Sequence, residues 1–120
     1  MAAALAQKED YLCHLRTISQ LIEETRIPEI ALLKIDAEGS ELDILSGIRD
    51  EHWPLIRQIV MEVHAGEEEG VAPITKILES RGFQATFEEQ AGFSASGVVN
   101  CYAIRPLRDA VHKKGVQTCD

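Results

Sequence analysis

The chain has 120 residues, of which 45% are hydrophobic and 27% are charged, as expected of one globular domain. Its net charge of −8 argues against nucleic acid or an anionic membrane as a partner, because both need clustered lysines and arginines. The sequence also lacks the roughly 20 consecutive apolar residues of a membrane span. Three widely spaced cysteines (Cys13, Cys101 and Cys119) fit neither a metal pattern nor a disulfide framework, which indicates a reducing cytoplasm.

The first part of the chain alternates between predicted strands and helices. Residues 11–15 are a weak candidate for a strand. Thr17 and Gln20 then have the spacing of a capping box, which predicts the start of a helix. The apolar run from Ile30 to Asp36 predicts a buried strand, and leucines and isoleucines at intervals of three and four predict a helix over 40–48.

The second part continues the alternation and ends differently. Residues 59–64 predict a strand, and residues 70–81 predict a helix bounded by glycines. Residues 83–88 alternate between apolar and polar side chains, as in an antiparallel or edge strand. A loop over 91–97 and a final strand over 98–104 complete a predicted hairpin.

This order of elements predicts an α/β fold. We expect parallel strands with helices on both faces of the sheet and a terminal antiparallel hairpin. Residues 1–11 are expected to be flexible or to cover an edge of the sheet, and residues 107–120 to form a disordered tail.

Two predicted strands end in polar residues. Asp36, Glu38 and Gly39 follow the first, while Glu62 and His64 close the second. Because the carboxyl ends of neighbouring parallel strands meet at one edge, we expect these residues in one crevice. An imidazole is suited to act as a general base near neutral pH, and Glu62 shares a strand face with His64 and would fix its tautomer.

These residues also have structural interpretations, which the sequence leaves open. His64 can cap the strand end, Asp36 can form an Asx turn, and Gly39 can supply a positive φ. Glu41 lies in the first turn of the next helix, where its negative charge is interpreted as interacting favourably with the helix dipole. A divalent metal is not expected, because no ligand spacing supports one among Asp36, Glu38, Glu62 and His64.

Four blocks of the sequence carry a resemblance. They are residues 15–19 (LRTIS), 33–41 (LKIDAEGSE), 58–64 (QIVMEVH) and 102–105 (YAIR). Together they resemble the FkbM family of S-adenosylmethionine-dependent methyltransferases, most closely the versions embedded in polyketide and nonribosomal-peptide assembly lines. The resemblance implies a Rossmann-like class I sheet over residues 12–106. It also implies methyl transfer to a hydroxyl of a small molecule, or of a polyketide or peptide intermediate delivered by a carrier protein.

The resemblance assigns roles to the polar residues at the strand ends. His64, Asp36 and Glu62 become the candidate catalytic residues, and Asp36, Glu38 and Gly39 the candidate contacts of S-adenosylmethionine.

The chain departs from the family at its beginning. The family binds its cofactor through a strand that ends in a glycine-rich turn, and residues 1–14 contain no glycine. We therefore expect the C-terminal portion of such a domain, without its main cofactor-binding half. The alternative function is a non-catalytic α/β module that acts by association. In either case the strand from Ile30 to Asp36 would have a bare outer edge, which predicts a homodimer through that edge, or residues 5–15 folded over it.

Overall fold

The protein is described by a computed structural model, which covers residues 7–64, 70–89 and 97–106. Within these residues the elements, in chain order, are α1 (Ile18–Thr25), β1 (Leu33–Ile35), α2 (Glu41–Ser46), the 3₁₀ helix η2 (Trp53–Leu55), β2 (Gln58–His64), α3 (Ala72–Ser80), β3 (Gln84–Glu89) and β4 (Val98–Ile104). Residues 1–6, most of the predicted loop 91–97 and the predicted tail 107–120 lie outside the described residues.

The four strands form one mixed sheet in the order β1-β2-β4-β3. β1 pairs with β2 in parallel, with Ile35 opposite Met61. β4 lies between β2 and β3 and is antiparallel to both, so β3 points in the same direction as β1 and β2. The predicted terminal antiparallel hairpin is therefore confirmed, and β1 and β2 are parallel as expected. The sequence did not predict that β4 would lie between β2 and β3.

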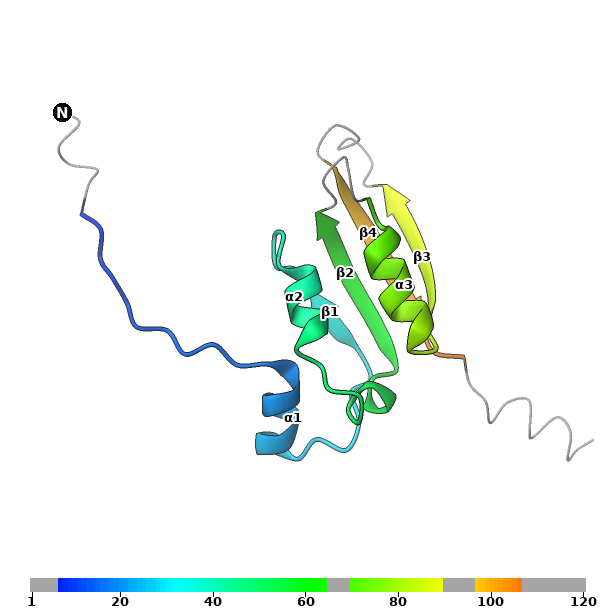
Figure 1. Cartoon of the computed structure of the whole chain (residues 1–120), viewed down its shortest axis with the longest axis horizontal. Helices are drawn as coiled ribbons and strands as arrows, with labels where there is room; N and C mark the ends of the chain where they lie inside the picture. The colour runs from blue at the N-terminus through cyan, green and yellow to red at the C-terminus, as the bar shows by residue number, and fades with distance from the viewer. Residues whose placement is uncertain (1–6, 65–69, 90–96, 107–120) are drawn as a thin grey trace, which may run out of the picture.

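The sequence predicted helices on both faces of the sheet, but the described helices α2 and α3 do not have this arrangement. In the described part of the chain, α2 and α3 lie on the same face (Figure 1). The crossovers β1-α2-β2 and β2-α3-β3 both advance across the sheet in one direction. Right-handed crossovers that advance in one direction place their helices on one side, which explains the arrangement.

The core lies between the sheet and these two helices. On β2, Ile59, Met61 and Val63 alternate with less buried residues, and Cys101 and Ala103 stand opposite on β4. Leu45, Ile74 and Leu78 from the helices pack onto them, together with Trp53 and Phe83. The other face of the sheet keeps Lys34, Thr86, Tyr102 and Ile104 exposed.

The N-terminal residues differ from the sequence prediction. Residues 11–15 are not a strand; they belong to an extended segment that runs away from α1 (Figure 1). No strand of the described chain pairs with it, and Tyr11, Leu12 and Leu15 are exposed. The predicted capping box is confirmed, because Thr17 and Gln20 exchange two hydrogen bonds at the start of α1.

The first predicted strand is shorter than expected. Ile30 forms only an isolated parallel bridge with Ile56, and a bend at Ala31 separates this bridge from β1. β1 has a neighbour on one side only, so it is an edge strand of the sheet formed by the described residues.

Candidate functional site

The polar residues predicted at the strand ends come from elements that meet at one edge of the sheet. β1 and β2 are parallel neighbours, so their carboxyl ends point the same way. Ile35 pairs with Met61, and continuing this register by one residue places Asp36 beside Glu62. α2 begins at the same edge, next to the end of β2 (Figure 1).

A tight turn connects β1 to α2. The Ser40 N–H donates a hydrogen bond to the Ala37 carbonyl at 3.4 Å, and the two residues between them, Glu38 and Gly39, have φ of 46° and 107°. A left-handed conformation is uncommon for a residue with a side chain, and such strained positions cluster at functional sites. A Cβ built on Gly39 would have no atom within 4 Å, so the glycine serves the backbone conformation and the space beside it is open.

The centre of the site is a contact between His64 and Glu41. The Nδ1 atom of His64, the last residue of β2, lies 2.7 Å from Oε1 of Glu41, the first residue of α2. The same Oε1 accepts a hydrogen bond of 3.0 Å from the Gly39 N–H. The Glu41 side chain is only 5% exposed, whereas that of His64 is 28% exposed.

The surroundings shift the pKa values of both groups. The hydrogen bond that His64 donates to Glu41 raises the pKa of His64, and the charges of Glu41, Glu38 and Glu62 add to this effect, while partial burial opposes it. Burial alone would raise the pKa of Glu41, but the hydrogen bonds from Gly39, from His64 and from the N–H of Glu41 itself, together with the charge of His64, lower it. Each shift favours the charged form of its group relative to the same group free in water.

The structure supplies His64 with a carboxylate partner that the sequence interpretation did not name. Glu62 was expected to orient His64, whereas the hydrogen bond to Nδ1 is made by Glu41. Glu62 is half-buried and raises the pKa of His64 through its charge. Asp36 and Glu38 lie exposed at the same edge. A βαβ unit returns its helix start to the strand edge, and this signal could have linked Glu41 to His64.

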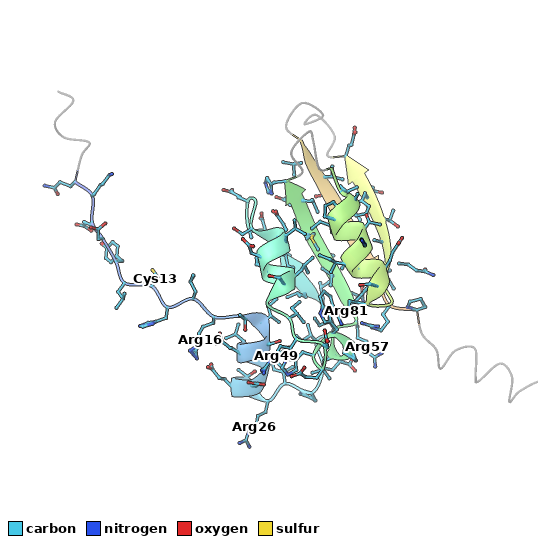
Figure 2. The ribbon with its side chains drawn as sticks, in the orientation of Figure 1. Cys13, Arg16, Arg26, Arg49, Arg57 and Arg81 are labelled. Atoms are coloured by element: carbon cyan, nitrogen blue, oxygen red, sulfur yellow. The ribbon has the colours of Figure 1, made fainter. Side chains whose placement is uncertain are left out.

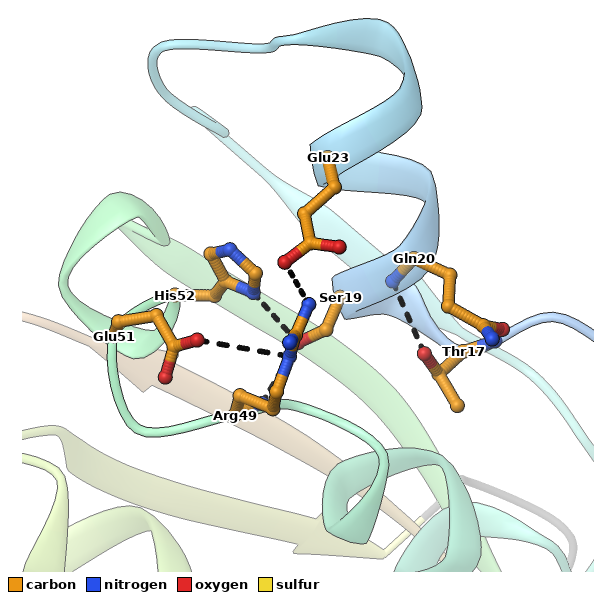
Figure 3. A network of polar contacts seen from close by, with 7 residues as sticks. All are labelled: Thr17, Ser19, Gln20, Glu23, Arg49, Glu51 and His52. Atoms are coloured by element: carbon orange, nitrogen blue, oxygen red, sulfur yellow. Dashed lines mark hydrogen bonds and ion pairs between the residues drawn. The ribbon is translucent and has the colours of Figure 1, made fainter.

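A metal ion has a different candidate position in this structure. Within the described ranges, the histidine and acidic side chains close enough to share an ion are Glu23, Glu51 and His52, with ligand atoms within 4.8 Å of one another. The Arg49 guanidinium forms ion pairs with both carboxylates, and Ser19 is hydrogen-bonded to His52 (Figure 3). The cluster is therefore an ion-pair network in which one guanidinium already contacts both carboxylates, and it includes none of the residues at the strand ends.

None of the helices in the described residues is long and apolar enough to cross a membrane.

Comparison with known proteins identifies the family. The sequence model described as Methyltransferase FkbM domain matches residues 12–85, which is more than half of the chain. No solved structure matches the chain.

Three curated relatives are similar to parts of the chain. The AMB antimetabolite synthetase AmbE of Pseudomonas aeruginosa (strain PAO1) is 35% identical over 102 residues, which cover 82% of this chain and 5% of AmbE. The 31-O-demethyl-FK506 methyltransferase FkbM of Streptomyces tacrolimicus is 37% identical over 81 residues, covering 68% of this chain and 31% of that protein. The methyltransferase sdnD of Sordaria araneosa is 44% identical over 61 residues, covering 50% of this chain and 23% of sdnD. The chain thus spans less than a third of the length of each of these relatives, and by its sequence it belongs to the FkbM methyltransferase domain family.

Proposed function

We propose that this chain is the acceptor-side portion of an S-adenosylmethionine-dependent O-methyltransferase, in which His64 is the general base. The observation that carries the proposal is the contact of 2.7 Å between His64 and Glu41 at the edge where β1 and β2 end. A base positioned in this way contributes typically about 10²–10⁴-fold to a rate.

The chemistry of the step assigns a task to each nitrogen of His64. Its Nδ1–H is held by Glu41, so Nε2 is available to take the proton of the acceptor hydroxyl. As that proton moves to Nε2, the acceptor oxygen forms its bond to the methyl carbon. S-adenosylmethionine, when bound, would supply the methyl group and would keep the electron pair of the broken bond on its sulfur.

The turn after β1 fits the cofactor in charge and in space. Asp36 and Glu38 present exposed carboxylates, which would meet the positive sulfonium favourably. Gly39 leaves open space beside its backbone, so a ligand can approach closely there. We propose that these three residues contact the cofactor and that a further part of a longer protein supplies the rest of its binding site.

The proposed acceptor is a hydroxyl group of a small molecule, or of a polyketide or peptide intermediate presented by a carrier protein. The support comes from the names of the relatives. One is named a 31-O-demethyl-FK506 methyltransferase and another an antimetabolite synthetase. The first of these names puts the methyl group on oxygen. We also propose that the protein is located in the cytoplasm.

The test is a titration of this chain with S-adenosylmethionine, which carries the sulfonium charge, followed by NMR of the backbone amides. We expect weak binding, with shift changes confined to Asp36–Glu41 and to His64. The Asp36→Asn variant should weaken binding, whereas Glu88→Gln, on the exposed face of β3, should not. Shift changes elsewhere, or none at saturating ligand, would refute the cofactor contacts. Tight binding would instead refute the need for a further part of the protein.

A second candidate function is association without catalysis, and the edge position of β1 favours it. The outer side of β1 carries no strand in the described chain, and Leu32 beside it is 54% exposed. Unpaired strand edges favour pairing with another chain. We propose a homodimer through this edge.

Sedimentation over a range of concentrations tests the dimer. Leu32→Lys should shift the equilibrium towards the monomer, and Ile104→Lys is the matched control, because Ile104 is 55% exposed and lies on β4 away from that edge. A wild-type chain that stays monomeric at every concentration would contradict the homodimer.

A further inference from the structure

One carboxylate oxygen joins two parts of the candidate site. Oε1 of Glu41 accepts one hydrogen bond from the Gly39 N–H and a second from Nδ1 of His64. Gly39 belongs to the left-handed turn after β1, and His64 ends the neighbouring strand. The turn proposed to contact the cofactor and the proposed base are therefore fixed to the same buried atom.

This contact decides which nitrogen of His64 carries the proton. Glu41 is ionised near neutral pH, because its pKa is lowered, so its oxygen can only accept hydrogen bonds. The neutral imidazole must then donate from Nδ1 and keep Nε2 free of a proton. Only this tautomer presents a basic nitrogen away from Glu41.

We propose that Glu41 is the positioning residue of the site, which holds His64 by Nδ1 and fixes it relative to the Glu38–Gly39 turn. This inference deepens the proposed function and rests on it for the role of His64 as base. Glu41 touches neither the acceptor nor the methyl group, and it acts through His64 and through the turn.

The other acidic residues around His64 act differently. Glu38 is exposed and Glu62 is half-buried, and both act on His64 through their charge. Glu41 is buried and makes the hydrogen bond itself. Removing the charge of Glu62 should therefore change the titration of His64 less than removing that of Glu41.

Nitrogen NMR of the His64 ring tests the inference without any activity. In the wild-type chain we expect the Nδ1–H tautomer and a pKa above that of an ordinary histidine. Glu41→Gln keeps an oxygen that can accept both hydrogen bonds but removes the charge, so the tautomer should persist while the pKa of His64 falls. Glu41→Ala removes both the accepting oxygen and the charge, so His64 should populate both neutral tautomers. The matched control, Glu62→Gln, should retain the tautomer and lower the pKa of His64 less.

Two results would overturn the positioning role. One is a wild-type His64 that carries its neutral-state proton on Nε2, which is measurable even if every Glu41 variant fails to fold. The other is a folded Glu41→Gln variant in which His64 titrates as in the wild type.

The activity of the longer methyltransferase separates this inference from the proposed function. There, Glu41→Gln should lower kcat and shift the acidic limb of its pH profile downward. Full turnover by His64→Ala would exclude His64 as the general base. The NMR result would still decide whether Glu41 positions the ring.

Discussion

Ser19 in α1 and His52, which lies 33 residues away along the chain, share a buried hydrogen bond of 2.7 Å between Oγ and Nδ1 (Figure 3). The same hydroxyl oxygen accepts a hydrogen bond of 2.7 Å from the backbone N–H of Arg49. Ser19 is 1% exposed, so water cannot replace it. This serine therefore connects α1 to the segment that follows α2.

Replacing this serine should destabilise the fold. Ser19→Ala leaves the Arg49 N–H and the His52 ring without their buried partner, and unsatisfied buried groups cost about 1–3 kcal/mol. The control is Ser46→Ala, because Ser46 is exposed and its hydroxyl bonds only the nearby Asp43 carbonyl; it should change stability by less than about 0.5 kcal/mol. Urea unfolding of both variants measures the difference. Equal losses would show that the connection through Ser19 carries no stability.

The pair of Glu41 and His64 should make stability depend on pH. His64 has a raised pKa in the fold, so its contribution is complete below its ordinary pKa of 6.5 and is lost as the pH rises through the raised value. Glu41 has a lowered pKa, so its contribution is complete above its ordinary pKa of 4.5 and is lost as the pH falls through the lowered value. The pair therefore stabilises the fold most between these two ordinary values.

Unfolding free energies measured across this range test the pair directly. The difference between the wild type and His64→Gln should be largest between pH 4.5 and 6.5 and should shrink on both sides. A difference that stays constant with pH would mean that the two groups are not coupled in solution.

The features predicted best from the sequence are those that depend only on residues close together in the chain. The capping box of Thr17 and Gln20 is a local motif and occurs as expected. The bounds of β4 match the predicted strand over 98–104, because its apolar run ends at Pro106 soon after. Both features need no information from distant parts of the chain.

The remaining features depend on contacts between distant residues. Nothing in the local pattern places β4 between β2 and β3, or both α2 and α3 on one face. Residues 11–15 have a strand-like composition but no strand beside them in the described chain, and an unpaired backbone segment does not form a strand. The partner of His64 likewise follows from the return of α2 to the strand edge rather than from spacing on β2.

The contacts of Arg105, at the other end of the sheet, should also stabilise the fold. Its guanidinium donates hydrogen bonds to the carbonyls of Trp53, Ile56 and Arg81 and lies 4.4 Å from the centre of the Phe83 ring. Hydrogen bonds from a charged donor contribute about 1.5–3 kcal/mol each, and bonds that share one donor group are not additive. We therefore expect Arg105→Met to lose about 3 kcal/mol.

Arg57→Met is the matched control for Arg105. The Arg57 guanidinium is exposed and pairs with exposed Glu29, so its loss should cost about 0–1 kcal/mol. Denaturant unfolding compares the two variants. A small effect of Arg105→Met would mean that water replaces the guanidinium at these carbonyls.

The cysteines provide a chemical test of the described fold. Cys101 is buried in the sheet, and burial raises the pKa of its thiol to about 11. At about pH 8, only about a thousandth of this thiol would be the reactive thiolate. Cys13 is exposed on the extended segment, away from the sheet (Figure 2). Iodoacetamide should therefore modify Cys13 before Cys101, and mass spectrometry of the peptides should find Cys101 protected.

Denaturant provides the control for this protection, because unfolding exposes both thiols to the reagent and should bring their rates close together. The protection of Cys101 depends on β4 lying between β2 and β3, with Cys101 directly opposite both Met61 and Phe87. If Cys101 instead reacted as fast as Cys13 in the native protein, β4 would not occupy the interior of the sheet. The mixed topology, with its single covered face, would then have to be revised.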